Sequence, residues 1–235
     1  MTCGARHLYH VNPKYNEEKA SYLYDSTSQV LLDFLQNKEC DFARCATTAT
    51  ILGMYEVMCS RNPHGMDHFS RARDLIEQCN WGATTPGLGG ACFWFSVSTE
   101  VLTCLRFNCS LTWDPDTWDL DLYTDEPKPY IAGSETLLAR RIVYICAKLV
   151  NYRFSISQPR GTDLEPNEIQ KSKWRQQWDL YNEWLTQWAK SVPRSMLPLG
   201  YLHPSQGGVV ESSFPVVLYV SVPPFLFSRF LILAA

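Results

Sequence analysis

This sequence has too few basic residues to suggest a nucleic acid interface. Its 235 residues include 21 Lys and Arg against 24 Asp and Glu, which gives a formal net charge of −3. Proteins that hold nucleic acid by its phosphates usually carry a basic excess or a basic stripe. We expect the densest basic groups to be solvated surface instead, because carboxylates or apolar residues surround them. These groups are Lys171, Lys173, Arg175 and the pair Arg140–Arg141.

A secretory signal is missing as well. Residues 1–15 contain no continuous apolar stretch, because Arg6, His7 and Lys14 interrupt them. The nine Cys are an odd number and are scattered, most of them within apolar stretches. These features indicate a reducing compartment, in which thiols pack as small hydrophobic side chains.

Sequence motifs of catalysis are absent too. The chain has no Gly-x-Ser-x-Gly turn of a hydrolase. Residues 87–90, Gly-Leu-Gly-Gly, precede an expected helix but lack the Lys and hydroxyl of a phosphate-binding loop and follow no strand. We therefore expect a loop that turns into a tightly packed helix, and no catalytic or cofactor-binding residues in this chain.

Two pairs of Cys, Cys40 with Cys45 and Cys104 with Cys109, raise the question of zinc because each pair is five residues apart. A tight zinc pair has Cys about two to four residues apart, with a second pair in reach. On a helix, five residues rotate a side chain by about 500°, so the two thiols of a pair should face different ways. The spacing therefore favours buried structural Cys and no metal site.

Two histidines, His64 and His68, lie four residues apart and next to Asp67. On a helix this spacing would present two imidazoles to a metal. However, Pro63 and Gly65 place His64 in a turn. We therefore interpret both residues as surface histidines.

The densest group of carboxylates comprises Asp114, Asp116, Asp119 and Asp121. A calcium-binding EF-hand loop would need Gly at its sixth position and Glu at its twelfth, where this chain has Asp119 and Asp125. Paired glycosidase carboxylates are a weaker alternative. We interpret the group as an acidic turn that holds Trp118.

Apolar side chains recur at spacings of three and four along most of the chain, and no segment alternates as a strand would. The pattern predicts an all-α fold, a bundle or solenoid-like array of about seven helices joined by Pro- and Gly-rich loops. Asp41 is the expected N-cap of the second helix and Ser134 that of the fifth. The expected helical segments are about 15–35, 41–59, 66–80, 91–107, 134–152 and 167–191, with a last apolar segment from Phe214. The apolar stripe of segment 15–35 comprises Ala20, Leu23, Tyr24, Val30, Leu31, Phe34 and Leu35. The aromatic stripe of segment 167–191 comprises Trp174, Trp178, Tyr181, Leu185 and Trp188.

The C-terminal segment 214–235 carries one charge, Arg229. Its length alone would allow a membrane span. Pro215 and the pair Pro223–Pro224 argue against one, since a bilayer penalises broken hydrogen bonding. We expect no membrane contact, with a tail-anchored protein as an alternative.

Several segments in a fixed order resemble the middle regulatory domain of fungal binuclear zinc-cluster transcription factors, and most closely its ARCA-like subgroup. The resemblance covers residues 5–222 and leaves 223–235 as an atypical apolar tail. The strongest segments are Gly87–Phe95, Cys104–Asn108 and Trp113–Trp118. Weaker ones are Ala5–Tyr15, which looks like the domain's early helix and turn, Leu52–Met58, His68–Ile76 and Glu211–Val217, which looks like a late helix start.

The resemblance implies a nuclear regulator of transcription by RNA polymerase II. In that family an N-terminal module with six Cys around two zinc ions contacts DNA. Here Cys3 stands alone before Cys40, so the zinc-cluster module is missing from these residues and the domain is expected to be truncated. Any zinc cofactor and any contact with DNA would belong to that missing module.

We therefore expect a non-catalytic regulatory module with protein partners, through self-association or a coactivator. Trp113 and Trp118 are the candidate partner contacts, because Trp is a frequent hot spot and is costly to expose on an acidic loop. Equally, both rings could fold back onto the core. The alternative is a helical enzyme that processes a small molecule with the acidic Trp loop and with His64 or His68 as acid and base.

Overall fold

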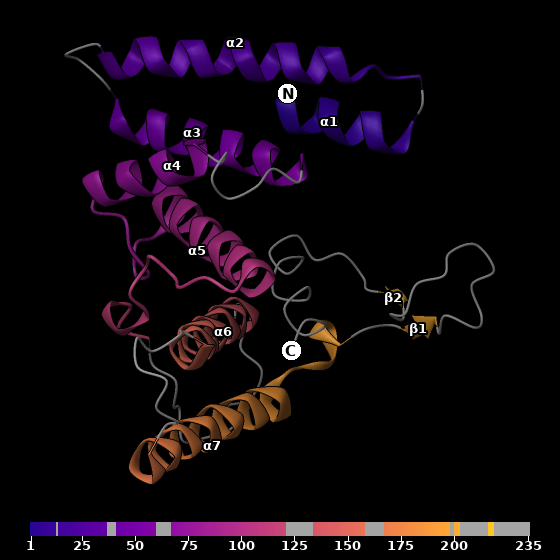
Figure 1. Cartoon of the computed structure of the whole chain (residues 1–235). Coiled ribbons are helices and arrows are strands. Elements are labelled where there is room, and N and C mark those ends of the chain that lie inside the picture. Colours follow the sequence, from indigo (N-terminus) through magenta and orange to yellow (C-terminus); the bar gives the residue numbers. More distant parts are fainter. Residues whose placement is uncertain are drawn as a thin grey trace. The chain divides into compact units, whose positions relative to one another are not determined.

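The computed structural model describes residues 1–12, 14–36, 41–59, 67–120, 134–157, 167–197, 200–202 and 216–218. Over these residues the fold is all-α, as the sequence predicts, apart from one short pair of strands (Figure 1). The α-helices are α1 (Thr2–Val11), α2 (Glu17–Gln36), α3 (Phe42–Met58), α4 (Asp67–Gln78), α5 (Gly87–Phe107), α6 (Ser134–Ser157) and α7 (Glu168–Ser191). Two 3-10 turns, η2 (Pro115–Thr117) and η3 (Arg194–Met196), add to them.

The chain forms two compact units. Unit 1 consists of Met1–Thr103 together with Asp116–Asp119. Unit 2 consists of Cys104–Pro115 together with Leu120–Ala235. Helix α5 belongs to unit 1 for most of its length and reaches unit 2 with its last turn.

Unit 1 is built on helices α1 to α4, whose ends largely follow local signals in the sequence. Helix α1 lies where the resemblance implies an early helix. Helix α3 begins after Asp41, whose side chain accepts a hydrogen bond from the Arg44 N–H at 3.2 Å, as expected of an N-cap. Helix α4 packs closely on α3, where a Cβ at Gly53 would lie 3.2 Å from the Phe69 Cα. Small residues therefore set how near these helices can approach.

Helix α5 begins at Gly87, four residues before the position expected from its apolar pattern. Gly87 has φ of +65°, which a side chain would strain. A Cβ at Gly89 would meet the Trp81 ring at 2.7 Å, and one at Gly90 would meet the Thr85 carbonyl oxygen at 2.0 Å. The glycines therefore serve close packing at the start of a helix, in agreement with the sequence interpretation.

The rest of α5 is a core helix whose only charged residues are Glu100 and Arg106. Ser98 donates to the Trp94 carbonyl at 2.6 Å and Thr99 donates to the Phe95 carbonyl at 2.9 Å, so these hydroxyls bond within the helix. Among the described helices, α5 alone is long and apolar enough to cross a membrane by length and composition. However, 61% of an 18-residue apolar stretch of this helix is buried inside the protein.

Unit 2 joins α6 and α7 through the aromatic stripe expected in the sixth helical segment. The Trp188 indole N–H donates to the Leu138 carbonyl at 2.7 Å, and the Tyr152 hydroxyl donates to the Trp174 carbonyl at 2.9 Å. Tyr152 and Tyr181 meet edge to face with 5.8 Å between ring centroids. Tyr181 and Trp188 are the buried side chains of α7, while most of its other described side chains are partly or fully exposed.

The structure differs from expectation near the C-terminus. The short strands β1 (Gly200–Leu202) and β2 (Val216–Leu218) pair antiparallel, with Gly200 opposite Leu218 and Leu202 opposite Val216. The prediction of a helical segment from Phe214 is therefore wrong at residues 216–218. Val is favoured in strands, and the partner strand lies too far away in sequence for the local pattern to reveal it. Residues 219–235, and with them the tail-anchor alternative, lie outside the described residues.

Replacing Gly90 by Ala is expected to destabilise unit 1 by about 1–3 kcal/mol, because the new Cβ would overlap the Thr85 carbonyl oxygen. Urea unfolding followed by circular dichroism measures the change. Gly4→Ala is the matched control, since a Cβ there meets nothing within 4 Å. The control should leave stability unchanged or raise it by up to about 1 kcal/mol. Equal unfolding midpoints for the two variants would contradict the close contact between Gly90 and the Thr85 carbonyl oxygen.

Candidate functional site: an apolar groove between α2 and α3

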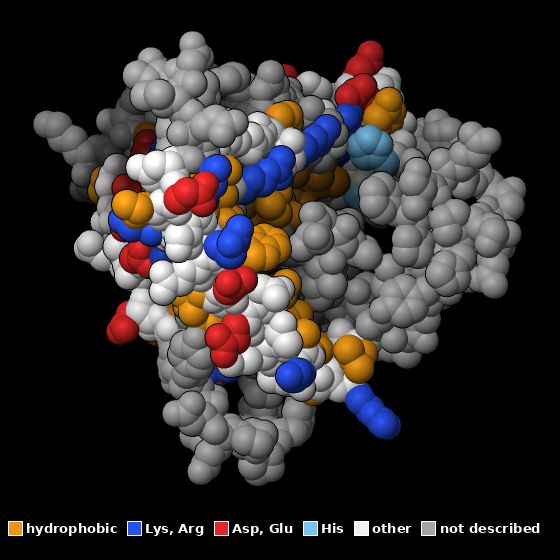
Figure 2. Space-filling view, turned by 60° about the horizontal axis from the view of Figure 1, so that its bottom comes forward, with side chains coloured by type: hydrophobic (Ala, Val, Ile, Leu, Met, Phe, Trp, Pro, Cys, Tyr) orange, Lys and Arg blue, Asp and Glu red, His pale blue; other side chains and the backbone are white. Residues whose placement is uncertain are grey.

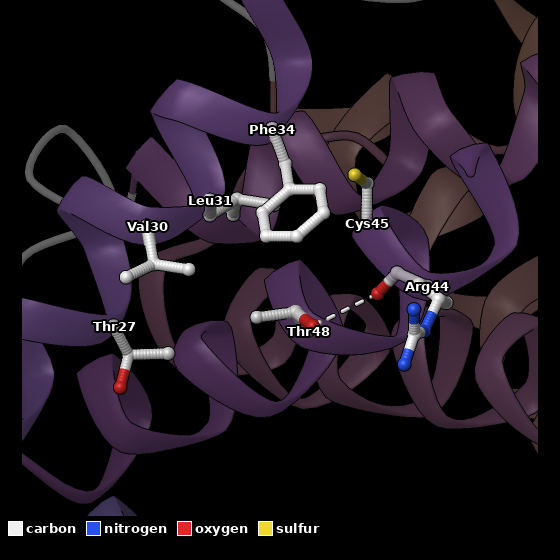
Figure 3. A pocket seen from close by; sticks show the side chains of 7 residues that line it. All are labelled: Thr27, Val30, Leu31, Phe34, Arg44, Cys45 and Thr48. Carbon is white, nitrogen blue, oxygen red and sulfur yellow. Dashed lines mark hydrogen bonds between the residues drawn. The ribbon is translucent and has the colours of Figure 1, made fainter. Parts of the chain in front are cut away.

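An apolar groove of about 270 Å³ opens between α2 and α3 in unit 1 (Figure 3). Leu31 and Cys45 are buried in it, whereas Val30 and Phe34 are 50% and 49% exposed. The residues that line it are Thr27, Val30, Leu31, Phe34, Arg44, Cys45 and Thr48. The sequence placed Val30 and Phe34 on the apolar stripe of α2 but could not show that α3 leaves them half uncovered.

The hydroxyl groups in the groove do not make it polar. Thr27 Oγ1 donates to the Leu23 carbonyl at 2.7 Å. Thr48 Oγ1 donates to the Arg44 carbonyl at 2.8 Å, the bond that is dashed in Figure 3. Both hydroxyls are therefore bonded to the backbone of their own helix. The lining presents mainly methyl, methylene and aromatic carbon.

One charged residue, Arg44, belongs to the lining. Its side chain is 80% exposed, and its Nε lies 3.9 Å from an oxygen of Asp41. An ion pair this long and this exposed contributes little to stability. Arg44 therefore keeps its hydrogen-bonding capacity for an acidic group that approaches the groove.

Helix α2 is also joined to α3 and α4 by a buried polar network. The Tyr24 hydroxyl donates to Glu56 Oε1 at 2.8 Å, and His68 Nδ1 lies 2.9 Å from the same oxygen. The Tyr24 hydroxyl and His68 Nδ1 are 2.9 Å apart. One carboxylate oxygen thus holds side chains from two neighbouring helices.

The Glu56 carboxylate also caps helix α4 from a distance. Its Oε1 accepts the His68 N–H and its Oε2 accepts the Phe69 N–H, both at 3.3 Å. These amides belong to the second and third residues of α4, so they have no acceptor within that helix. The partial positive charge of a helix N-terminus further favours an anion at this position.

Burial and hydrogen bonding act in opposite directions on Glu56, which is 0% exposed. Burial alone raises the pKa of its carboxyl, but hydrogen bonds from His68 and Tyr24 outweigh burial and leave the pKa below its usual value. Glu56 is therefore ionised at neutral pH. An ionised Glu56 requires His68 to carry its proton on Nδ1 and donate it to the carboxylate.

The interpretation of His68 as a surface histidine is wrong, because the start of α4 packs on α3 and buries the ring. Its ring bonds with the side chains of Tyr24 and Glu56 in unit 1. His64 and Asp121 lie outside the described residues. Sequence reasoning missed Glu56, although it is the one carboxylate of the largely apolar helix α3.

The acidic loop forms the expected turn. Pro115–Thr117 is a 3-10 turn, and the Trp118 ring meets Phe93 and Trp94 edge to face at centroid distances of 5.9 and 5.5 Å. Trp113 is 8% exposed and Trp118 is 3% exposed. Both rings thus fold back onto the core. A direct contact of Trp113 or Trp118 with a partner would require the loop to move, so their role as partner contacts stays a prediction.

The two thiols of Cys104 and Cys109 do not face different ways, as helical rotation predicted. Their sulfur atoms lie 3.3 Å apart in unit 2. The prediction was wrong because α5 ends at Phe107, so helical geometry does not extend to Cys109. Among the described residues, no three His, Cys, Asp or Glu side chains are grouped to hold a metal ion. Cys40 lies outside those residues.

Comparison with known proteins adds no family assignment. No family model matches the chain, and no curated protein or solved structure is significantly similar to it. The resemblance to zinc-cluster regulators therefore depends on the order of its sequence segments alone.

The network predicts that Glu56→Gln destabilises the chain by about 2–4 kcal/mol, because a neutral amide replaces a buried acceptor of charge-assisted hydrogen bonds. Thermal unfolding by circular dichroism measures the loss. Glu77→Gln is the matched control, since Glu77 is an exposed residue of α4. It should change stability by less than about 0.5 kcal/mol.

The stability difference between the wild type and Glu56→Gln should also depend on pH. Because folding lowers the pKa of Glu56, its contribution is complete above the unfolded-state pKa of about 4.3 and is lost as pH falls through the lower folded-state pKa. The stability gap between the wild type and Glu56→Gln should therefore narrow below about pH 4.3. A gap that stays constant down to the acid transition would contradict an ionised Glu56.

Proposed function

We propose that this chain is a non-catalytic, helical regulatory domain that binds protein partners in the nucleus, as the resemblance to zinc-cluster transcription factors implies. The observation that carries the proposal is the groove between α2 and α3, where Val30 and Phe34 stay half exposed above buried Leu31 and Cys45. Half-exposed apolar side chains around a concave apolar surface are typical of protein interaction sites.

The dimensions of the groove favour a helix of a partner over a small molecule. Its volume of about 270 Å³ is below that of most pockets for drug-sized ligands. Val30 and Phe34 lie four residues apart on one helix face, a spacing that fits the apolar anchors of a facing amphipathic helix. Arg44 suits an acidic residue beside those anchors.

Charge supports protein rather than DNA as the direct partner. Figure 2 shows a face on which Lys and Arg, Asp and Glu, and hydrophobic side chains all reach the surface. With a net charge of −3, the chain has no overall basic excess to neutralise phosphates. In this proposal a zinc-cluster module outside these residues contacts DNA, and the chain needs no zinc of its own.

The buried network supports a non-catalytic role for His68. A general acid or base must reach the proton that it transfers, directly or through one water. His68 and Glu56 are enclosed and bonded to each other and to Tyr24. Their chemistry in this arrangement is to join helices.

Phe34→Asp is expected to weaken partner binding by roughly tenfold or more, because it places a charge on the apolar surface that a partner would cover. Tyr22→Asp is the matched control, since Tyr22 is an exposed aromatic residue of the same helix outside the groove. Sedimentation equilibrium measures self-association. A transcription reporter, with the chain fused to a foreign DNA-binding domain, measures coactivator recruitment.

The two measurements separate the partners. A loss of self-association in Phe34→Asp alone identifies a second copy as the partner, and a loss of reporter output with unchanged self-association identifies a coactivator. If Phe34→Asp and Tyr22→Asp behave alike in both assays, the groove is not the interaction site.

The family assignment has its own test. We expect transcripts from the native locus to encode a basic segment with six Cys upstream of Met1, because the resemblance implies a zinc-cluster module before this domain. Sequencing of the full transcripts provides the measurement. A different domain at that position would argue against the family, although it would leave the groove experiment unaffected.

A further inference from the structure

The thiols of Cys104 and Cys109 are brought together by the way α5 ends. Asn108 adopts a left-handed conformation with φ of 52°, which turns the chain back over the last helical turn. The Cys109 N–H then bonds the Cys104 carbonyl at 3.3 Å. This six-residue closure is the Schellman motif, in which the side chains of the two closing residues commonly touch. Here both closing residues are Cys, and their sulfur atoms lie 3.3 Å apart.

The end of α5 is held in place by α6 within unit 2. The Leu111 N–H donates to Asn151 Oδ1 at 3.0 Å, and Arg153 Nη1 donates to the Leu105 carbonyl at 3.1 Å. Asn108 Nδ2 donates to Ser157 Oγ at 3.1 Å. These bonds anchor residues between the two Cys and just after Cys109, so the backbone that positions the two thiols is held by neighbouring structure as well as by its own closure.

We propose that Cys104 and Cys109 form a reversible disulfide, which makes the C-terminal end of α5 a site of oxidative modification. A disulfide requires the two sulfur atoms to approach to about 2 Å. The backbone closure already directs both side chains to the same side, so the remaining movement of roughly 1 Å falls on side-chain torsions rather than on the helix.

A disulfide such as oxidised glutathione is a suitable oxidant. The Cys109 thiolate attacks one sulfur of the oxidant, because Cys109 is more exposed than Cys104, and it releases one glutathione thiolate. The Cys104 thiolate then attacks the Cys109 sulfur and displaces the second glutathione. Both protein thiols lose their protons to the two glutathione thiolates, so two protein thiols are oxidised and one glutathione disulfide is reduced.

Proximity rather than acidity drives this reaction. A helix C-terminus carries partial negative charge, so it does not stabilise either thiolate. The first attack should therefore be slow, whereas the second is intramolecular between sulfur atoms that already touch. Closure also removes the hydrogen that Cys104 now donates to the Ser110 carbonyl at 3.3 Å. Oxidation thus changes the bonding of the loop that follows α5.

Trypsin offers a direct assay because it cleaves after Arg106, between the two Cys. The full chain is equilibrated in buffers of reduced and oxidised glutathione, quenched with acid, alkylated, digested and analysed by mass spectrometry. A Cys104–Cys109 disulfide joins the peptide that ends at Arg106 to the one that begins at Phe107. We expect the equilibrium constant for forming the Cys104–Cys109 disulfide from oxidised glutathione to be at least about tenfold larger in the folded chain than in denaturant.

Substitutions then test the geometry. Asn108→Gly should preserve the disulfide, because Gly adopts positive φ freely, whereas Asn108→Val should lower its equilibrium constant toward the denatured value. Cys92→Ser, on the same tryptic peptide as Cys104, should have no effect. Cys104→Ser should stop the reaction at a mixed disulfide on Cys109.

Two outcomes would overturn the proposal. One is a folded-state equilibrium constant equal to or below that in denaturant, a comparison that needs no variant to fold. The other is a wild-type reaction that ends as a mixed disulfide on Cys109 without the joined peptides.

Discussion

A single buried anion organises the first half of this chain. The Glu56 carboxylate accepts four hydrogen bonds, from the Tyr24 hydroxyl, the His68 ring and the backbone amides of His68 and Phe69 in the first turn of α4. A buried carboxylate without such donors would be costly, so α2, α3 and α4 must keep their positions for the charge to be tolerated. The groove beside Val30 and Phe34 lies between two of these helices. Its shape therefore depends on an ionic interaction farther along the same helix pair.

Glycines and small residues play the complementary part. Gly53 allows α4 to approach α3, and Gly90 allows α5 to start against the loop before it. These contacts are apolar or purely steric, and they resist compression, whereas the Glu56 network resists separation. Together they determine one spacing between the helices of unit 1, which a simple apolar interface would leave less closely specified.

The sequence predicted what depends on neighbours in the chain. The positions of six helices follow from apolar spacing, and the N-cap at Asp41 follows from local chemistry. The burial of His68 could not be predicted this way, because it arises from α4 packing on a different helix. The meeting of Cys104 and Cys109 was missed for another reason. Rotation along a helix was extended past the residue where the helix ends.

Helix α7 contrasts with these tightly held elements. It contributes two buried side chains, Tyr181 and Trp188, and two hydrogen bonds described above attach it to α6. Fewer of its side chains are buried than in α3, so its separation exposes less apolar surface and its local opening costs less free energy. Of α6 and α7, we therefore expect α7 to open first, so its amide hydrogens should exchange with solvent before those of α6.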